Sequence, residues 1–141
     1  MCGILGRIHY SKKEKSSLNH DLIQNRGPDS VNKFSFDNID LVHTRLAIVN
    51  KGNRSDQPII NKNKILICNG EILNFKQIKR LISYSYNTNS DCEAILAVYQ
   101  KYGTLGFRLL KGFFSFVLLD LDKKKIYLVK DSIGKKPLFY Y

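Results

Sequence analysis

Residues 1–6 of the chain read MCGILG, and the thiol of Cys2 stands directly before an apolar run. The apolar and small residues from Gly3 to Tyr10 predict a buried first β-strand with Cys2 at its mouth. Removal of Met1 would give Cys2 a free α-amino group, with a pKa of about 7.7–8.0, that can take the thiol proton directly or through a water. The stretch therefore presents either an N-terminal nucleophile or a buried core cysteine.

Hydrophobic periodicity and turn residues divide the rest of the chain into strands and helices. Strands are predicted at residues 3–10, 31–36, 39–48, 65–68, 113–121, 126–130 and, where the chain stops, 137–141. Helices are predicted at residues 18–24, 74–82, 91–102 and 104–110, with Asn74 capping the second and a Ser90/Glu93 capping box starting the third. This order indicates an α+β domain in which two sheets pack face to face with helices outside.

The composition fits one globular domain over residues 1–141. Because the chain stops within a predicted strand, we expect this domain to lack its last elements. The chain is 43% hydrophobic and 25% charged, which is enough apolar material for a core. No apolar run approaches the roughly 18–20 residues of a membrane span, and no signal peptide is recognisable. The three cysteines, Cys2, Cys68 and Cys92, lack the spacing of a disulfide framework or a zinc site. We therefore expect a cytoplasmic protein without a metal site.

The net charge of +11 raises the question of nucleic acid, because basic surfaces attract phosphate backbones. The lysines stand in short groups mostly where turns are expected, at residues 12–15, 62–64, 123–125 and 135–136, without a repeated aromatic-basic pattern. We therefore do not expect a dedicated nucleic-acid reader.

A polar triplet, Asn69-Gly70-Glu71, follows the apolar strand 65–68, which is predicted to end there. Glycine permits close approach of the backbone to a ligand, and asparagine offers an amide donor. An Asn side chain and a Gly N–H together suit an oxyanion hole, each donor contributing about 3 kcal/mol of transition-state stabilisation. The structural alternative is an ordinary turn that ends the strand.

Two further charged residues are candidates for ligand binding. Arg45 interrupts the apolar segment 42–49, where its guanidinium must either pair with a structural Asp or Glu or receive a carboxylate from a ligand. Asp91 stands at the first position of a predicted helix, where it either complements the helix dipole or receives an ammonium group. His20 and His43 have no evident partner for a Cys/His dyad, and we interpret both as structural.

Taken in order, Cys2, Arg45, Asn69-Gly70-Glu71 and Asp91 resemble the glutaminase domain of the class II, N-terminal-nucleophile glutamine amidotransferases. Within that class the chain is most similar to the glutamine-hydrolysing asparagine synthetases. The matching segments are MCGILG at 1–6, RGPD at 26–29, HTRLAIV at 43–49, QP at 57–58, NGEILN at 69–74, SDCEAI at 90–95, GFFSFVLLD at 112–120 and KDSIGKKPLFYY at 130–141. They cover the whole chain, and their order and spacing are more specific than any one of them.

The resemblance implies a four-layer αββα sandwich of the Ntn-hydrolase type. It also implies that glutamine is hydrolysed to glutamate and ammonia through a thioester on Cys2, without a cofactor. The roles it assigns are the oxyanion donors to Asn69 and Gly70, the substrate α-carboxylate to Arg45, and the α-ammonium to Glu71 and Asp91, with backbone groups near Ile48 helping.

The chain departs from the family pattern at Leu73, Lys130 and Ser132, where tyrosine, arginine and a bulky or charged residue are more usual. None of these changes removes a presumed catalytic group.

Family members also continue through further strands into an ATP-dependent synthetase domain, whose pyrophosphate loop does not occur in these residues. ATP and Mg would belong to that domain, so we expect ammonia to pass to a synthetase, in cis or in trans, that amidates aspartate or a related acceptor. The alternative is a catalytically silent module that assembles with such a partner.

Overall fold

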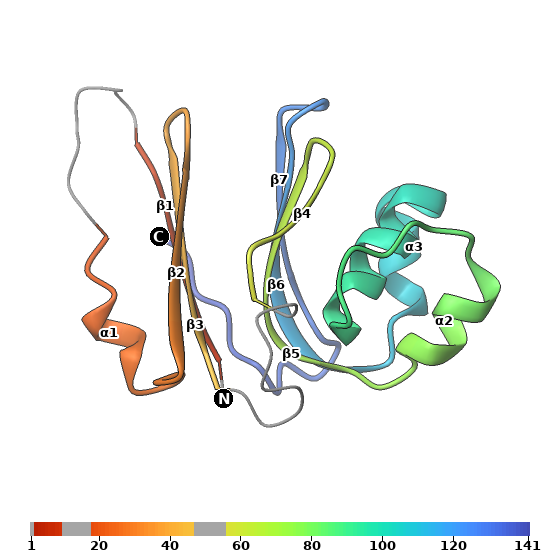
Figure 1. The fold of residues 1–141 in the computed structure, drawn as a ribbon, viewed down its shortest axis with the longest axis horizontal. Helices are drawn as coiled ribbons and strands as arrows, with labels where there is room; N and C mark the ends of the chain where they lie inside the picture. Colours follow the sequence, from red (N-terminus) through yellow and green to blue (C-terminus); the bar gives the residue numbers. More distant parts are fainter. Residues whose placement is uncertain (1, 10–17, 47–55) are drawn as a thin grey trace.

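Two antiparallel sheets form the centre of the computed structural model, which describes residues 2–9, 18–46 and 56–141. The first sheet has the order β1-β3-β2, and the second has the order β4-β5-β6-β7. Their strands are β1 (Gly3–Ile8), β2 (Ser30–Phe36), β3 (Ile39–Arg45), β4 (Ile59–Asn61), β5 (Lys64–Ile72), β6 (Gly112–Asp120) and β7 (Lys125–Lys130). The sheets face each other across the middle of the molecule (Figure 1).

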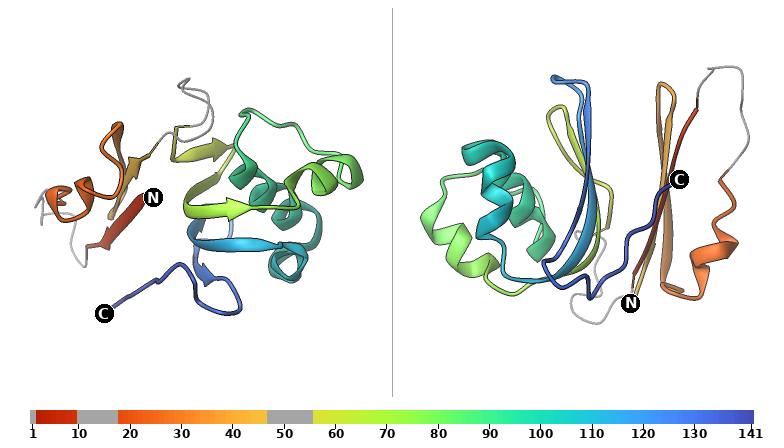
Figure 2. Two further views of the ribbon diagram at one scale, coloured as in Figure 1. Left: turned by 90° about the horizontal axis from the view of Figure 1, so that it is seen from below. Right: turned by 180° about the vertical axis from the view of Figure 1, so that it is seen from behind.

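Helices cover the outer face of each sheet (Figures 1 and 2). The first sheet carries α1 (Asp21–Gln24), and the second carries α2 (Phe75–Leu81), the 3-10 helix η2 (Asp91–Glu93), α3 (Ala94–Tyr102) and the 3-10 helix η3 (Gly103–Leu109). The layers therefore run α-β-β-α, and the predicted α+β sandwich is confirmed. None of the helices in the described ranges is long and apolar enough to cross a membrane.

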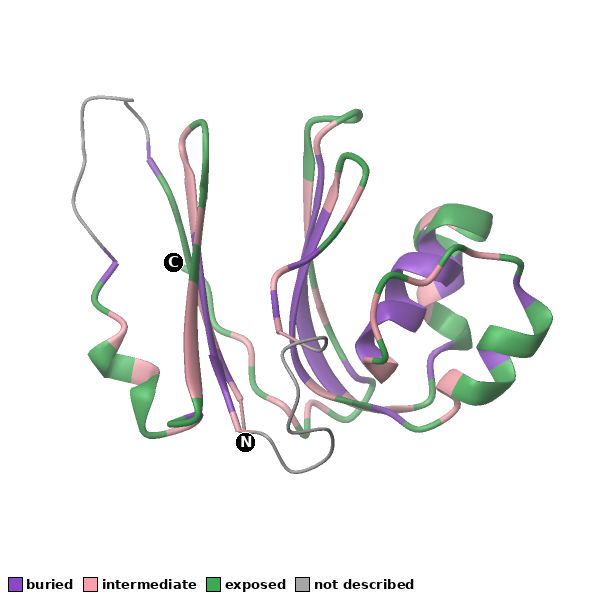
Figure 3. Cartoon of the chain, in the orientation of Figure 1, coloured by how far each residue is buried: buried purple, intermediate pink, exposed green. Residues whose placement is uncertain are grey.

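Side-chain alternation gives the second sheet two apolar faces. Odd-numbered residues of β5 and β6 meet Leu41 of β3 in the core between the sheets, formed by Leu41, Ile65, Ile67, Val117 and Leu119. Even-numbered residues of the same strands, among them Leu66 and Phe116, pack with α3 in the larger core on the helical side. Buried residues accordingly concentrate on β5, β6 and α3 (Figure 3).

The sequence predicted that the strand would end at the polar triplet, but strand β5 does not end there. It continues to Ile72, because β6 pairs with it in register through Gly70↔Phe114 and Glu71↔Phe113. A pairing partner distant in sequence thus overrides the local turn signal of Asn-Gly. The short strand β4, which pairs with Leu66 of β5, was not predicted.

The prediction of a strand at 137–141 is wrong, because these residues have no strand structure. Their aromatic side chains are exposed, Phe139 by 87% and Tyr140 by 82%, so no neighbouring strand in the described part of the chain covers them. The strand predicted to reach Ile48 is described only as far as Arg45, and its remaining residues fall largely outside the described ranges.

Two predicted caps differ in detail. Helix α2 begins after Asn74, but the Asn74 side chain accepts from the Lys111 N–H at 2.9 Å and donates to the Leu109 carbonyl, so it holds η3 instead of capping α2. Ser90 does accept from the Cys92 N–H, whereas the Glu93 carboxylate bonds to the Thr88 N–H at 2.7 Å and not back to Ser90. Competing partners from neighbouring loops explain both differences.

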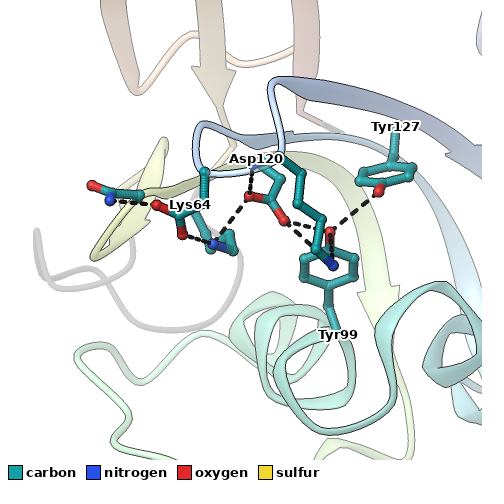
Figure 4. Close-up of polar contacts among 7 residues, drawn as sticks. Lys64, Tyr99, Asp120 and Tyr127 are labelled. Atoms are coloured by element: carbon teal, nitrogen blue, oxygen red, sulfur yellow. Dashed lines mark hydrogen bonds and ion pairs between the residues drawn. The ribbon is translucent and has the colours of Figure 1, made fainter.

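A polar network closes one end of the second sheet (Figure 4). Asp120, at the end of β6, is 1% exposed and lies 3.1 Å from the ammonium group of Lys64 on the paired strand. The hydroxyl of Tyr99 on α3 donates to the same carboxylate at 2.5 Å and lies 3.3 Å from the hydroxyl of Tyr127. Every polar group drawn in this network has a partner, which is how buried charge is normally tolerated.

Candidate active site

Cys2 lies at the open start of β1. Strand β1 pairs with β3 through Gly3↔Thr44, and extension of this register places Cys2 opposite Arg45. The Arg26 guanidinium donates to the Cys2 carbonyl at 3.3 Å, and the Gly3 N–H donates to the Thr44 hydroxyl at 3.1 Å. Both bonds fix the peptide unit that directly follows the half-buried Cys2.

The thiol and the Arg45 guanidinium share the face of the first sheet that looks toward the second sheet. Ile4 packs against the core between the sheets, so alternation along β1 directs Cys2 to the same side, and Arg45 follows because paired residues share a face. Arg45 is only 8% exposed, and its Nη1 lies 2.7 Å from Oδ1 of Asp56. The structure thus supplies the acidic partner that the sequence left open, at the position expected to receive a substrate carboxylate.

A tight loop supports this end of β3. A side chain at Gly27 would collide with the backbone of Thr44 and Arg45, so only glycine lets the loop lie this close. The Asp29 N–H then donates to the Arg45 carbonyl at 3.0 Å. The sequence RGPD at 26–29 is therefore explained by contact with the strand that carries Arg45.

Asn69 and Gly70 lie at the end of β5. Figures 1 and 2 show that this end of β5 and the start of β1 lie at the same end of the sandwich. Asn69 shares the odd-numbered register of Ile65 and Ile67, so its side chain belongs to the face between the sheets, where it is 5% exposed. The structure brings the predicted amide donor to the side of the sheet that faces Cys2.

The N–H of Gly70 points to the edge of β5 that β6 does not occupy. N–H groups alternate between the two edges of a strand. On this edge the Cys68 N–H donates to Oε1 of Gln57 at 2.5 Å, and the Ile72 N–H donates to Oδ2 of Asp91 at 2.6 Å. Gly70 lies between them, and no described residue accepts from its N–H. The Gly70 N–H, which the sequence predicted as an oxyanion donor, is therefore left without an acceptor among the described residues.

Only glycine fits at position 70. A Cβ there would collide with the Phe113 carbonyl and the Phe114 Cα of β6, and the backbone φ of 157° is one that other residues rarely adopt. The close approach of β5 to β6 therefore requires glycine at this position.

Two carboxylates flank the end of β5. Burial raises the pKa of Asp91, the hydrogen bond from the Ile72 N–H lowers it, and the negative charge of Glu71 raises it again. Glu71 is exposed and Asp91 is half-buried, so a ligand can reach the pair from solvent. Such a pair favours a cation, and an ammonium group between them would relieve their mutual repulsion.

The sequence did not identify several polar residues that the structure adds to this region. His43 and Ser115 are 1% and 0% exposed on the facing strands β3 and β6, and neither has a hydrogen-bond partner among the described residues. Gln57 is buried and holds the edge of β5 at Cys68. The available signal was a polar residue inside an apolar strand. For His43 the sequence showed no partner for a Cys/His dyad, and a structural role was therefore predicted.

Ile48, predicted to help bind glutamine through its backbone, lies outside the described residues. Within the described ranges no three His, Cys, Asp or Glu side chains are grouped as metal ligands require. The predicted site residues among the described ones offer a thiol, a guanidinium, amide donors and carboxylates.

A family model for the glutamine amidotransferase domain matches residues 1–141. The chain belongs to this family. Within it, the chain is homologous to the N-terminal region of glutamine-hydrolysing asparagine synthetases, as its sequence motifs predicted. It is 37% identical over 147 residues to the asparagine synthetase [glutamine-hydrolyzing] of Zea mays, and 31% identical over 164 residues to a putative asparagine synthetase [glutamine-hydrolyzing] of Methanocaldococcus jannaschii.

These matches cover 99% and 100% of the chain but only 25% and 32% of the two relatives. The chain thus spans about a quarter to a third of their length. Among solved structures, glutamine phosphoribosylpyrophosphate amidotransferase from B. subtilis superposes with a TM-score of 0.55 at 21% identity, over 67% of this chain and 23% of that one. That similarity supports the amidotransferase fold.

Proposed function

We propose that the chain hydrolyses the side-chain amide of glutamine, with Cys2 as the nucleophile once Met1 has been removed. The observation that carries this proposal is the convergence of three kinds of group at one end of the sandwich. Cys2 and Arg45 come from the first sheet, Asn69 and the open N–H of Gly70 come from the second, and the carboxylates of Glu71 and Asp91 lie at its end.

The charges suit a zwitterionic amino acid. Arg45 would take the α-carboxylate through its guanidinium, while Asp56 keeps that guanidinium in place by accepting from Nη1. Glu71 and Asp91 would take the α-ammonium. The substrate side chain would then extend toward Cys2, which places its amide carbon near the thiol.

The chemistry then proceeds in two halves. The α-amino group of Cys2 takes the thiol proton, and the sulfur attacks the amide carbon. Asn69 Nδ2 and the Gly70 N–H hold the oxyanion. The C–N bond breaks as the amino group returns the proton to the leaving nitrogen, which gives ammonia and a thioester. In the second half the same amino group takes a proton from water, hydroxide adds to the thioester, and glutamate leaves as the thiol is regenerated.

We infer further that ammonia is delivered to an ATP-dependent synthetase, in the same polypeptide or in a partner, which amidates aspartate or a related carboxylate. Two facts support this. The relatives bear the name of glutamine-hydrolysing asparagine synthetases, and the chain spans only a fraction of their length.

The test is glutamate release from glutamine by the chain, with its mature N-terminus established by mass spectrometry. The Met1-processed protein should be active, and Cys2→Ala should lose activity by at least about three orders of magnitude. Cys68→Val is the matched control, because Cys68 faces the helical side of β5 and is 1% exposed. Equal rates for the processed protein and Cys2→Ala would instead support a silent assembly module.

A further inference from the structure

His43 is an unusual residue in the core between the sheets. Its ring is 1% exposed, and neither ring nitrogen has a hydrogen-bond partner among the described residues. A neutral imidazole has one donor and one acceptor, and leaving both unpaired in a buried site is costly. Leu41, two residues away on the same face, shows that an apolar side chain fits this environment without that cost.

The position of His43 links it to the proposed active site. It pairs with Ile4 of β1, so it stands next to the Cys2–Arg45 pair on the same face of the first sheet. The Cys68 backbone of β5, which directly precedes Asn69, lies close enough to the ring to raise the pKa of His43, although neither ring nitrogen makes a hydrogen bond of good geometry with a described residue. His43 thus spans from the strand that carries Arg45 to the strand that carries the proposed oxyanion donor.

Unpaired polar groups surround this position from both sheets. Ser115 is 0% exposed and pairs across the β5–β6 ladder with Asn69, so the two side chains are neighbours on the face between the sheets. On the first sheet, Asn32 pairs with His43, and Ser30 pairs with Arg45. The unpaired atoms are Ser30 Oγ, Asn32 Nδ2, both ring nitrogens of His43 and Ser115 Oγ. Natural cores rarely concentrate such groups without a ligand or water to satisfy them.

The orientation of the Asn69 amide is what these groups can control. The two ends of a carboxamide have nearly the same shape, so its hydrogen bonds decide which end faces a given side. Asn69 can serve as an oxyanion donor only if Nδ2 faces Cys2. A donor placed at Oδ1 from the interior would fix that orientation, and both the Ser115 hydroxyl and a water held by a neutral His43 ring supply one.

We propose that His43 and Ser115 form a buried hydrogen-bonding site for water beside Asn69, and that His43 thereby acts as a positioning residue for the Asn69 amide. The inference rests on the proposed function for its kinetic consequence, but the site itself has a structural readout. The ring serves this role in its uncharged form, accepting through one nitrogen and donating through the other.

A double-mutant cycle with His43→Leu and Asn69→Ala tests the kinetic role. His43→Leu in the full chain should lower kcat for glutamine hydrolysis on the order of 10- to 100-fold, with KM changed by less than about 3-fold. His43→Gln, which keeps a donor and an acceptor, should recover activity to within about 5-fold of the wild type. In the Asn69→Ala background, His43→Leu should cost less than about 3-fold, because the amide that it positions is gone.

The matched control is His9→Leu. His9 is also buried, but its Nε2 is paired with Asp40 at 2.6 Å at the far end of β1. This variant should lose stability without the selective loss of kcat. The positioning role would be overturned if His43→Leu left kcat at the wild-type value. It would also be overturned if His43→Leu lowered kcat by the same factor with Asn69 present and with Asn69→Ala.

Ser115→Ala provides a second variant in case His43→Leu does not fold, because it removes one hydroxyl from the same site. It should lower kcat by about 3- to 10-fold, and an unchanged kcat would overturn the proposal.

The water site can be examined even if the chain proves inactive toward glutamine. A high-resolution crystal structure should show a water within hydrogen-bonding distance of both the His43 ring and the Ser115 hydroxyl. Density in which both groups bond directly to protein atoms would overturn the site. Equal glutamine hydrolysis by the wild type and Cys2→Ala would instead refute the proposed function alone.

Discussion

Strands β5 and β6 carry buried polar residues toward both ends of their ladder, and the two ends differ in whether these residues have hydrogen-bond partners. At one end Lys64 pairs with Asp120, and each charged or hydroxyl group of the network has a partner. At the other end Asn69 pairs with Ser115, and the Ser115 hydroxyl has no partner among the described residues. The same ladder thus holds one network in which every group has a partner and, at Ser115, a buried hydroxyl that has none among the described residues.

The completed end also shows how burial is compensated. Burial alone would raise the pKa of Asp120, but the Tyr99 hydroxyl, the Lys123 N–H and the Lys64 ammonium hold it below its usual value. Burial would lower the pKa of Lys64, and the carboxylates of Asp122 and Asp120 raise it instead. Both groups therefore stay charged across the neutral range.

The largest effect is expected from breaking the completed end. Asp120→Ala leaves Lys64 and Tyr99 without their buried acceptor, and we expect the free energy of unfolding to fall by about 3–5 kcal/mol. The folded fraction should hydrolyse glutamine with kcat within about 2-fold of the wild type, because the network lies far from Cys2. Urea unfolding and the glutaminase assay measure the two quantities. A stability loss below about 1 kcal/mol would show that the Lys64–Asp120 network does not stabilise the fold as expected.

The opposite result is expected at the other end. Asn69→Ala should lower kcat about 100- to 1000-fold, equivalent to about 3–4 kcal/mol of transition-state stabilisation. Its free energy of unfolding should change by less than about 1 kcal/mol, since no described bond to the fold is lost. If Asn69→Ala instead destabilises the chain as much as Asp120→Ala does, both ends serve the fold.

The stability of the fold should depend on pH because of the buried His43 ring. Burial lowers the pKa of His43 from 6.5 to about 4; the positive charge of Arg45 acts in the same direction, while Asp56 and the Cys68 backbone oppose it. In the unfolded chain His43 therefore binds a proton below about pH 6.5, whereas in the folded chain it binds one only below about pH 4. The free energy of unfolding should fall by about 3 kcal/mol as the pH falls through this window.

Denaturant titrations at several pH values measure this slope. His43→Leu should remove most of this slope, because leucine does not titrate. An identical slope in wild type and His43→Leu would show that the pKa of His43 is the same in the folded and the unfolded chain.

The smallest effect is expected at the carboxylate pair. Asp91→Asn keeps an oxygen that can accept from the Ile72 N–H but removes the charge, so KM for glutamine should rise about 10-fold with kcat within about 3-fold. Asp122→Asn is the control, because that exposed carboxylate belongs to the opposite end of the ladder. An unchanged KM in Asp91→Asn would assign Asp91 to the support of β5 alone.

Much of this organisation was readable from local sequence. Periodicity identified most of the strands and the two main helices, and the order of Cys2, Arg45, Asn69 and Asp91 indicated the amidotransferase family. These features depend on side-chain character at fixed spacing, which is a property of the chain alone.

Tertiary structure decided what depends on partners distant in sequence. Pairing with β6 carried β5 through Asn69-Gly70-Glu71 and left the Gly70 N–H at an open edge, whereas the isolated triplet predicted a turn. The packing of one sheet on the other buried the His43 ring and left it without a hydrogen-bond partner among the described residues. The sequence by itself determined which chemical groups the protein has, but their hydrogen-bond partners were settled only when the two sheets met, because such partners lie across the fold.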